Sequence, residues 1–299
     1  MESRDGRLTF RARDLNVEES LSPEEPLSLE HGLILHKAVY SHIVENYLDG
    51  KKVPLLVSSS IDAPAGSGLG SSSALVVALI EAFATALHLP LGPYDVARLA
   101  FQIERIELRL AGGRQDQYAA AFGGLNYIEF LDAERVIVNP LRVRRDYLNE
   151  FESALVVCFT GQSRKSEMII REQVKGLEDM NPETIENMHQ LKSDALLMKQ
   201  ALLQGDVREI AHILGRSWQA KKRTASSIAT PAVDKLFELG LENGAMAGKV
   251  SGAGGGGFLM FCTDPENRVR LISSLNAAGG QASSVKFTFE GAEGWNIRS

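Results

Sequence analysis

The chain has 299 residues, of which 44% are hydrophobic and 23% are charged, a composition typical of a globular protein with one large domain or two packed lobes. A formal net charge of −6 disfavours nucleic acid or an anionic membrane as the main partner. Two cysteines cannot build a disulfide framework, and six scattered histidines form no zinc-binding cluster. Residues 1–10 lack the apolar core of a signal peptide, and no run of about 18 apolar residues occurs, so we expect a cytoplasmic protein without a membrane span.

The first half of the chain is predicted to mix strands and helices. Alternating apolar residues predict strands over residues 8–15, 54–61, 125–131 and 135–143. Apolar residues spaced three and four apart predict helices over residues 31–48, 74–87, 93–110 and 115–122. Residues 18–30 are acidic and contain proline, which predicts a loop, so the strand over residues 8–15 lacks an obvious neighbour.

The second half is predicted to contain more helix than strand. Strands are expected over residues 154–160, 249–262 and 284–290, with a glycine run inside the second of them. Helices are expected over residues 167–174, 182–203, 207–220, 231–243 and 267–278. Cys158 and Cys262 lie in apolar, strand-like runs, which predicts buried reduced thiols. Because strands and helices do not alternate strictly, an α+β fold in two lobes is favoured, with the division near residue 150.

A glycine-rich stretch, PAGSGLGSSS (residues 64–73), leads from a predicted strand into the apolar helix over residues 74–87. Its glycines permit backbone conformations that point N–H groups at a ligand, and no Cβ blocks an approaching anion. The unpaired N–H groups and the dipole at the helix N-terminus also favour negative charge. The stretch therefore predicts a phosphate site, the alternative being a plain turn with a serine cap. It is neither a Walker A loop nor a dinucleotide fingerprint, because its spacing is GxGxG without a following lysine.

Three segments resemble the GHMP kinases, the superfamily of galactokinase, homoserine kinase, mevalonate kinase and phosphomevalonate kinase. PAGSGLGSSSA (residues 64–74) resembles the nucleotide-binding motif, GGRQDQYAAAFGG (112–124) the segment with the catalytic aspartate, and KVSGAGGGGF (249–258) the C-terminal glycine motif. The segments occur in the order expected of the family. The resemblance implies a two-lobed α+β GHMP kinase fold, with a ribosomal protein S5-like, ATP-binding lobe over residues 1–150 and a ferredoxin-like lobe over residues 151–299.

The resemblance also implies that ATP and Mg²⁺ are bound. The ATP-binding residues that it predicts are Pro64, Gly66, Ser67, Gly68, Leu69, Gly70, Ser71, Ser72 and Ser73. Asp116 matches the catalytic aspartate; from its position alone a helix-capping acid would be favoured, and the motif reverses that preference. Glu104 matches the magnesium-binding glutamate, acting with Ser72, and the alternatives are Ser71 for the hydroxyl and Glu107 for the carboxylate. The alternative for Glu104 is a solvent-exposed glutamate on an amphipathic helix.

A further set of residues is predicted to contact the substrate or its phosphate. These are Gly112, Gly113, Gln115, Arg164, Gly252, Gly254 and Gly255. Arg164, with Lys165 beside it, could hold a phosphate on a sugar, and a solvated loop pair is the alternative. Gln115 and Gln117 flank the aspartate and could hydrogen-bond sugar hydroxyls or lie on an ordinary helix surface. The C-terminal glycine motif is expected to lie against the phosphate loop and close the site between the lobes.

Within the superfamily, LHKAVY (residues 35–40) and the three segments above resemble the branch of bacterial D-glycero-D-manno-heptose 7-phosphate kinases and the fucokinase kinase domain. This implies phosphorylation of the anomeric hydroxyl of the heptose 7-phosphate to a 1,7-bisphosphate, a precursor of surface polysaccharides. The alternatives are a kinase of an unphosphorylated sugar, such as fucose, galactose or an N-acetylhexosamine, and a nucleotide- or sugar-binding relative without turnover. In residues 1–30 nothing matches the branch's glycine-rich turn ending in Thr-Asp, so we expect the first substrate motif to be missing from the N-terminal domain.

Overall fold

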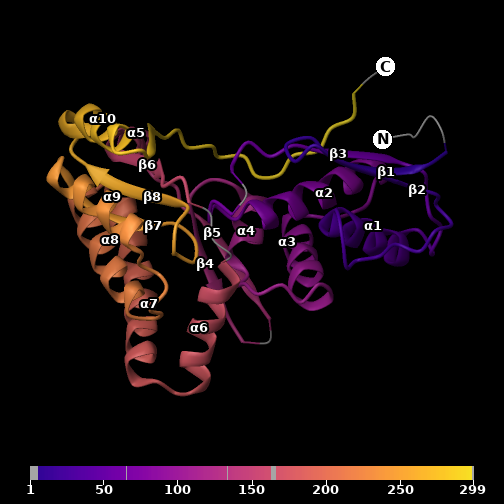
Figure 1. The fold of residues 1–299 in the computed structure, drawn as a ribbon, viewed down its shortest axis with the longest axis horizontal. Helices are drawn as coiled ribbons and strands as arrows, with labels where there is room; N and C mark the ends of the chain where they lie inside the picture. Colours follow the sequence, from indigo (N-terminus) through magenta and orange to yellow (C-terminus); the bar gives the residue numbers. More distant parts are fainter. Residues whose placement is uncertain (1–5, 65, 133, 163–165, 298–299) are drawn as a thin grey trace. The chain divides into compact units, whose positions relative to one another are not determined.

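The computed structural model describes residues 6–64, 66–132, 134–162 and 166–297 (Figure 1). The chain folds into two compact units. The N-terminal unit comprises Met1–Pro64, Gly70–Gly124 and Phe289–Ser299, and the C-terminal unit comprises Ala65–Leu69 and Leu125–Thr288. The division predicted near residue 150 differs from this, because residue 150 lies inside helix α5 (Arg145–Ala154) and the chain leaves the N-terminal unit at Gly124.

The N-terminal unit contains a three-stranded sheet in the order β2-β1-β3. The central strand β1 (Leu8–Ala12) pairs antiparallel with β2 (Val17–Leu21) and parallel with β3 (Leu56–Ser59). The expectation that β1 lacks a neighbour is therefore wrong, and so is the loop predicted from residue 18. The acidic residues of β2 obscured its strand character, because Glu18 and Glu19 are stabilised by ion pairs with Arg11 and Lys37 rather than by apolar packing.

Helices make up most of the rest of this unit. They are α1 (Ile34–Tyr47), α2 (Ser71–Leu87), α3 (Pro93–Phe101) and α4 (Gln115–Phe122). The core between them contains large, fully buried side chains, among them Tyr40, Ile43, Ile80, Phe83 and Ile103. The helix predicted over residues 93–110 instead changes into a π-helix at Gln102–Glu107, a wider turn that is common at functional sites.

The last described segment of the chain, residues 289–297, returns to the N-terminal unit. Its backbone lies so close to the end of α4 that a Cβ at Gly291 would overlap the carbonyl oxygen of Ala121. The strand predicted over residues 284–290 is wrong, since β9 covers only Gln281–Ser284. Glycine at position 291 thus permits a close backbone contact with α4, which apolar periodicity in the sequence could not predict.

The C-terminal unit is built on an antiparallel sheet in the order β7-β8-β6-β9. Its first three strands are β7 (Ala245–Val250), β8 (Phe258–Thr263) and β6 (Leu155–Phe159). The single strand predicted over residues 249–262 is thus two strands, because the glycine run breaks the hydrogen-bonded ladder and forms the connecting loop. Cys158 and Cys262 are free and buried in this sheet, and burial raises the pKa of their thiols to about 11 and about 12.

The remaining elements of this unit are a hairpin and helices. The hairpin pairs β4 (Asn126–Phe130) with β5 (Val136–Pro140). The helices are α5, α6 (Ser166–Glu178), α7 (Pro182–Gln204), α8 (Val207–Lys222), α9 (Pro231–Glu242), a short 3₁₀ turn (Pro265–Asn267) and α10 (Arg268–Ala277). Asn181, Asp206 and Thr230 cap three of them by accepting backbone hydrogen bonds, which is why these boundaries are readable from the sequence.

Figure 1 shows α8 and α9 against the sheet and α7 beside α8. The core of this unit gathers Trp218 from α8, Leu236 from α9, Phe261 from β8 and Leu271 from α10, all buried. None of the helices in the described parts of the chain has the length and apolar composition of a membrane span.

Candidate active site

The predicted phosphate loop, residues 64–73, passes from the C-terminal unit to the N-terminal unit between Leu69 and Gly70. Gly66, Gly68 and Gly70 have φ angles of +71°, +75° and +72°, in the left-handed region that glycine adopts without steric cost. Glycine therefore occurs at every second position because the loop backbone needs a positive φ at each of them. Among the described residues of the loop, Gly66–Leu69 belong to the C-terminal unit, whereas Pro64 and Gly70–Ser73 belong to the N-terminal unit.

The three serines of the loop lie inside α2, which begins at Ser71 and not at Ala74 as predicted. Gly70 is the N-cap residue and no side chain caps this helix, so the serine cap of the alternative reading does not form. Ser72 is exposed, whereas Ser73 is buried and accepts a hydrogen bond from Nε2 of Gln117 at 3.1 Å. The unpaired N–H groups of this first turn remain a favourable position for a phosphate.

Glu104 is the fully buried carboxylate of the site. It lies in the π-helix with 0% of its surface exposed. Ser72 Oγ donates to its Oε1 atom at 2.7 Å, and Gln117 Nε2 donates to its Oε2 atom at 2.6 Å. The guanidinium of Arg105 lies 3.7 Å from Oε1 and offsets part of the buried charge.

The structure thus brings together Glu104 and Ser72, the residues predicted to hold the metal. The alternative carboxylate, Glu107, is instead hydrogen-bonded to His42 Nδ1 at 2.8 Å and accepts from Gln102 at 3.2 Å. Both glutamates lie in the π-helix, three positions apart, and they have different hydrogen-bond partners.

Glu104 and Ser72 fit a magnesium ion. Mg²⁺ prefers hard oxygen ligands at about 2.0–2.1 Å in octahedral geometry, which places adjacent ligand oxygens about 2.9 Å apart. The 2.7 Å between Ser72 Oγ and Glu104 Oε1 is close to that spacing. Among the described residues no group of three or more His, Cys, Asp or Glu side chains could hold a metal, so phosphate and water would supply the other ligands.

Asp116 lies in the first turn of α4, where the helix dipole favours a negative charge. It is partly exposed, and its side chain lies against Gly70, where an added Cβ would be 2.9 Å from the Asp116 Cγ atom. Glycine is therefore favoured at position 70 for two reasons: it adopts the left-handed φ without strain, and its missing Cβ leaves space for the Asp116 carboxylate. Gln115 is exposed and its Nε2 atom lies 3.4 Å from Asp116 Oδ1.

Arg105 is a residue of this site that the sequence analysis missed. Its side chain is only 12% exposed, and its Nε donates to the Gly113 carbonyl at 3.3 Å. The guanidinium lies so close to Gly112 that a Cβ there would overlap it. Gly112 thus leaves room for the Arg105 side chain, and the Gly113 carbonyl accepts its hydrogen bond. That Gly112 and Gly113 contact substrate stays a prediction.

Gln117 was also misjudged, since it is 0% exposed and is neither helix surface nor open to a sugar. It shares the buried face of α4 with Ala121, one helical turn further on.

The C-terminal glycine run contacts the first part of the phosphate loop within the C-terminal unit. Phe258 N donates to the carbonyl oxygen of Ser67 at 3.1 Å. A Cβ at Gly252 would overlap the Gly68 carbonyl oxygen, and one at Gly257 would overlap that of Ser67. The two backbones are therefore in direct contact, and glycine is required where they meet.

Other residues of this run contact protein rather than open space. Gly255 N donates to the Ile228 carbonyl at 2.7 Å, and Gly254 packs against the Ile228 side chain. The Lys221 ammonium donates to the Gly252 carbonyl. Gly254 and Gly255 thus pack on the segment after α8, and their contact with substrate stays a prediction. Arg164 and Lys165 lie outside the described residues.

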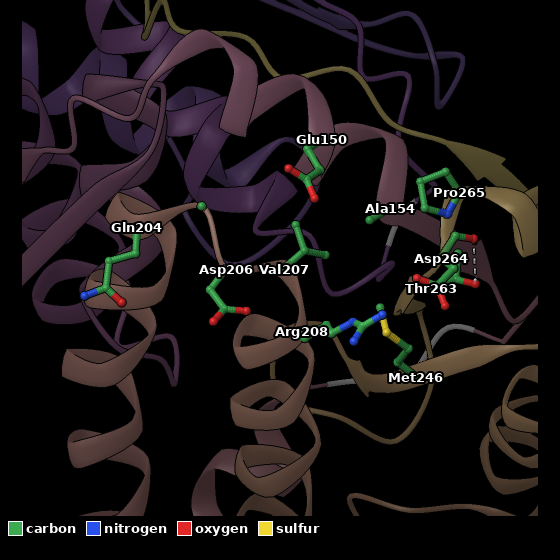
Figure 2. A pocket seen from close by; sticks show the side chains of 11 residues that line it. Glu150, Ala154, Gln204, Asp206, Val207, Arg208, Met246, Thr263, Asp264 and Pro265 are labelled. Atoms are coloured by element: carbon green, nitrogen blue, oxygen red, sulfur yellow. Dashed lines mark hydrogen bonds between the residues drawn. The ribbon is translucent and has the colours of Figure 1, made fainter.

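A cavity of about 460 Å³ in the C-terminal unit is separate from all predicted site residues (Figure 2). It is lined by side chains from the ends of α5, α7, β7 and β8 and the start of α8, among them Glu150, Asp206, Arg208 and Met246. The Asp206 side chain caps α8 by accepting a hydrogen bond from the Glu209 N–H. Thr263, at the cavity wall, donates to the Gly244 carbonyl. This cavity therefore has no part in the candidate active site.

Replacing Gly252 by alanine is expected to destabilise the protein by about 2–4 kcal/mol, through a strained left-handed φ of +62° and overlap with Gly68. Gly279→Ala is the control, because Gly279 has a φ of +91° but nothing within 4 Å of an added Cβ. We expect about 1–2 kcal/mol there. Denaturant unfolding measures both, and equal losses would contradict the close contact between the two loops.

Comparison with known proteins identifies the family. The model of the GHMP kinases N terminal domain matches residues 34–124, and that of the GHMP kinases C terminal domain matches residues 198–281. D-glycero-alpha-D-manno-heptose 7-phosphate kinase of Campylobacter jejuni is 40% identical over 293 residues, which are 98% of this chain and 86% of that protein.

Solved structures agree with this relationship. The crystal structure of a D-glycero-D-manno-heptose 1-phosphate kinase from Bacteroides thetaiotaomicron has a TM-score of 0.83 and 39% identity, and the match covers 100% of this chain and 86% of that one. A mevalonate kinase structure at 17% identity has a TM-score of 0.74 over 97% of this chain and 88% of that one, and shows the shared fold alone. The predicted α+β fold of two lobes is confirmed.

Proposed function

This chain belongs to the GHMP kinase family, and we propose that it transfers the γ-phosphoryl group of ATP to the anomeric hydroxyl of a heptose phosphate, D-glycero-D-manno-heptose 7-phosphate in the first instance. The observation that carries the chemistry is the Glu104–Ser72 pair beside Asp116 at the first turn of α2. The choice of sugar rests on the 40% identity to the Campylobacter jejuni kinase over nearly the whole chain.

In this proposal, phosphate oxygens of ATP bind the N–H groups of the loop and of the first turn of α2. These groups are fixed before the reaction, so they stabilise developing negative charge without reorganising. Glu104 and Ser72 would hold Mg²⁺. When bound, the metal neutralises phosphate charge in the transfer step.

Asp116 is assigned to the acceptor hydroxyl. A carboxylate in the first turn of a helix is stabilised in its ionised form by the helix dipole. Such a carboxylate accepts a hydrogen bond readily but is a weak base. It therefore orients the attacking oxygen and receives its proton as the bond to phosphorus forms. Phosphoryl transfer of this kind needs no covalent enzyme intermediate.

The proposal is tested by measuring ADP release with a panel of acceptors. The panel contains heptose 7-phosphate, the unphosphorylated heptose, fucose, galactose and N-acetylglucosamine. We expect the highest kcat/KM with heptose 7-phosphate, and a new anomeric phosphate signal in the ³¹P NMR spectrum of the product. A higher kcat/KM for an unphosphorylated sugar would overturn the choice of substrate. ATP binding without turnover on any acceptor would overturn the activity itself.

A further inference from the structure

We propose that Gln117 is a positioning residue that fixes which carboxylate oxygen of Glu104 is offered to the metal, and that it thereby sets the Mg²⁺ affinity of the nucleotide complex. This inference rests on the proposed function, because it concerns the same metal pair. It adds a residue that the family resemblance did not assign to any role.

The hydrogen bonds of Gln117 support this role. Its Nε2 atom donates to Glu104 Oε2 at 2.6 Å and to Ser73 Oγ at 3.1 Å. Gln117 and Glu104 are both 0% exposed, so water does not compete for these bonds. The amide therefore ties the carboxylate of the π-helix to the first turn of α2.

The orientation of the Gln117 amide is determined by Glu104. An ionised carboxylate can only accept hydrogen bonds, so Nε2 and not Oε1 must face Glu104. As a result, Gln117 Oε1 is buried without a hydrogen-bond partner, a situation that costs about 1–3 kcal/mol. An apolar side chain of similar size would avoid this cost but would leave Glu104 Oε2 unpaired. Gln117 Oε1 is therefore left unpaired because the amide turns its Nε2 atom toward Glu104 Oε2.

The effect of Gln117 on Glu104 and Ser72 depends on which carboxylate oxygen of Glu104 it binds. With Oε2 bound by Gln117, Oε1 is the atom left to face exposed Ser72, whose Oγ lies 2.7 Å away. Outer partners that orient metal-binding side chains typically contribute 10–100-fold to metal affinity. Without Gln117, the Glu104 carboxylate would be free to rotate, and the Oε1–Ser72 pair would lose its fixed spacing.

The experiment compares Gln117→Met with Gln117→Leu, because both variants remove the donor from this buried position without adding a charge. Mg²⁺ and Mn²⁺ are titrated into each protein by calorimetry with a non-hydrolysable ATP analogue bound, so that the readout does not depend on turnover. We expect metal affinity to fall about 10–100-fold in both variants, while binding of the analogue without metal changes less than threefold. The Mg²⁺ concentration for half-maximal activity rises by the same factor.

The control is Gln190→Met in the C-terminal unit. Gln190 also donates to a buried carboxylate, Asp194 Oδ1, at 2.8 Å, but has no contact with the candidate site. A change below threefold in folded Gln117 variants would overturn the proposal, as would an equal change in Gln190→Met. If Gln117→Met does not fold, Gln117→Leu decides. If the wild-type protein phosphorylates no sugar phosphate, the proposed function fails, and the metal titration still decides the role of Gln117.

Discussion

Asp116→Asn is expected to lower kcat by about 10²- to 10⁴-fold, while the affinity for ATP changes less than threefold. Asparagine has the shape of aspartate, so it fits beside Gly70 and preserves the packing that places the side chain there. It carries no charge and cannot receive the proton of the attacking hydroxyl. The loss should therefore appear in the chemical step, measured as steady-state kcat and as single-turnover rate.

Asp95→Asn is the matched control for this variant. Asp95 is also an acid in the first turn of a helix, α3, where its carboxylate accepts the Gly92 N–H at 3.2 Å. Asp95 caps α3 and also pairs with Arg98 at 3.4 Å, and neither contact involves a residue of the candidate site, so kcat should stay within about twofold. If Asp116→Asn also retained most of its activity, the acceptor hydroxyl would have to be oriented by another group and the assignment of Asp116 would be wrong.

Glu104→Gln is expected to lower kcat by about 10²-fold or more and to raise the Mg²⁺ requirement at least tenfold. The variant keeps the shape of the side chain and its contact with Ser72 but removes the negative charge that would hold the metal. Metal ions supply several kcal/mol of charge stabilisation in such reactions, and each 1.36 kcal/mol corresponds to tenfold in rate. Activity measured across a Mg²⁺ titration, with EDTA as the zero point, separates the two effects.

Glu107→Gln is the control for this second prediction, because Glu107 is hydrogen-bonded to His42 rather than to the loop serines. Its Mg²⁺ dependence should match that of the wild-type protein within about threefold. A larger shift in Glu107→Gln than in Glu104→Gln would reverse the assignment of the metal ligand. Thermal unfolding of both variants shows whether a loss of activity follows from a loss of fold.

Several helices of this protein could be read from local patterns. The helix expected over residues 115–122 is α4, and Pro182 and Pro231 begin α7 and α9 as the sequence indicates. Caps and proline act on the backbone within one turn, so their effect does not depend on the rest of the fold. The π-helix at Gln102–Glu107 has no such local signature, because the wider turn is stabilised by contacts such as Glu104 with Gln117.

From the sequence by itself, the glycine loop, Glu104, Ser72 and Asp116 could be predicted as members of the candidate site through their spacing and the family resemblance, whereas the parts played by Arg105 and Gln117 could not. Only the tertiary structure decided how these groups are held. Gln117 reaches Ser73 across 44 positions of sequence and Glu104 across 13, and its burial depends on all three segments packing together. Hydrogen-bond partners in a protein interior are groups that folding brings close together, and the order of residues along the chain does not show which distant groups will meet.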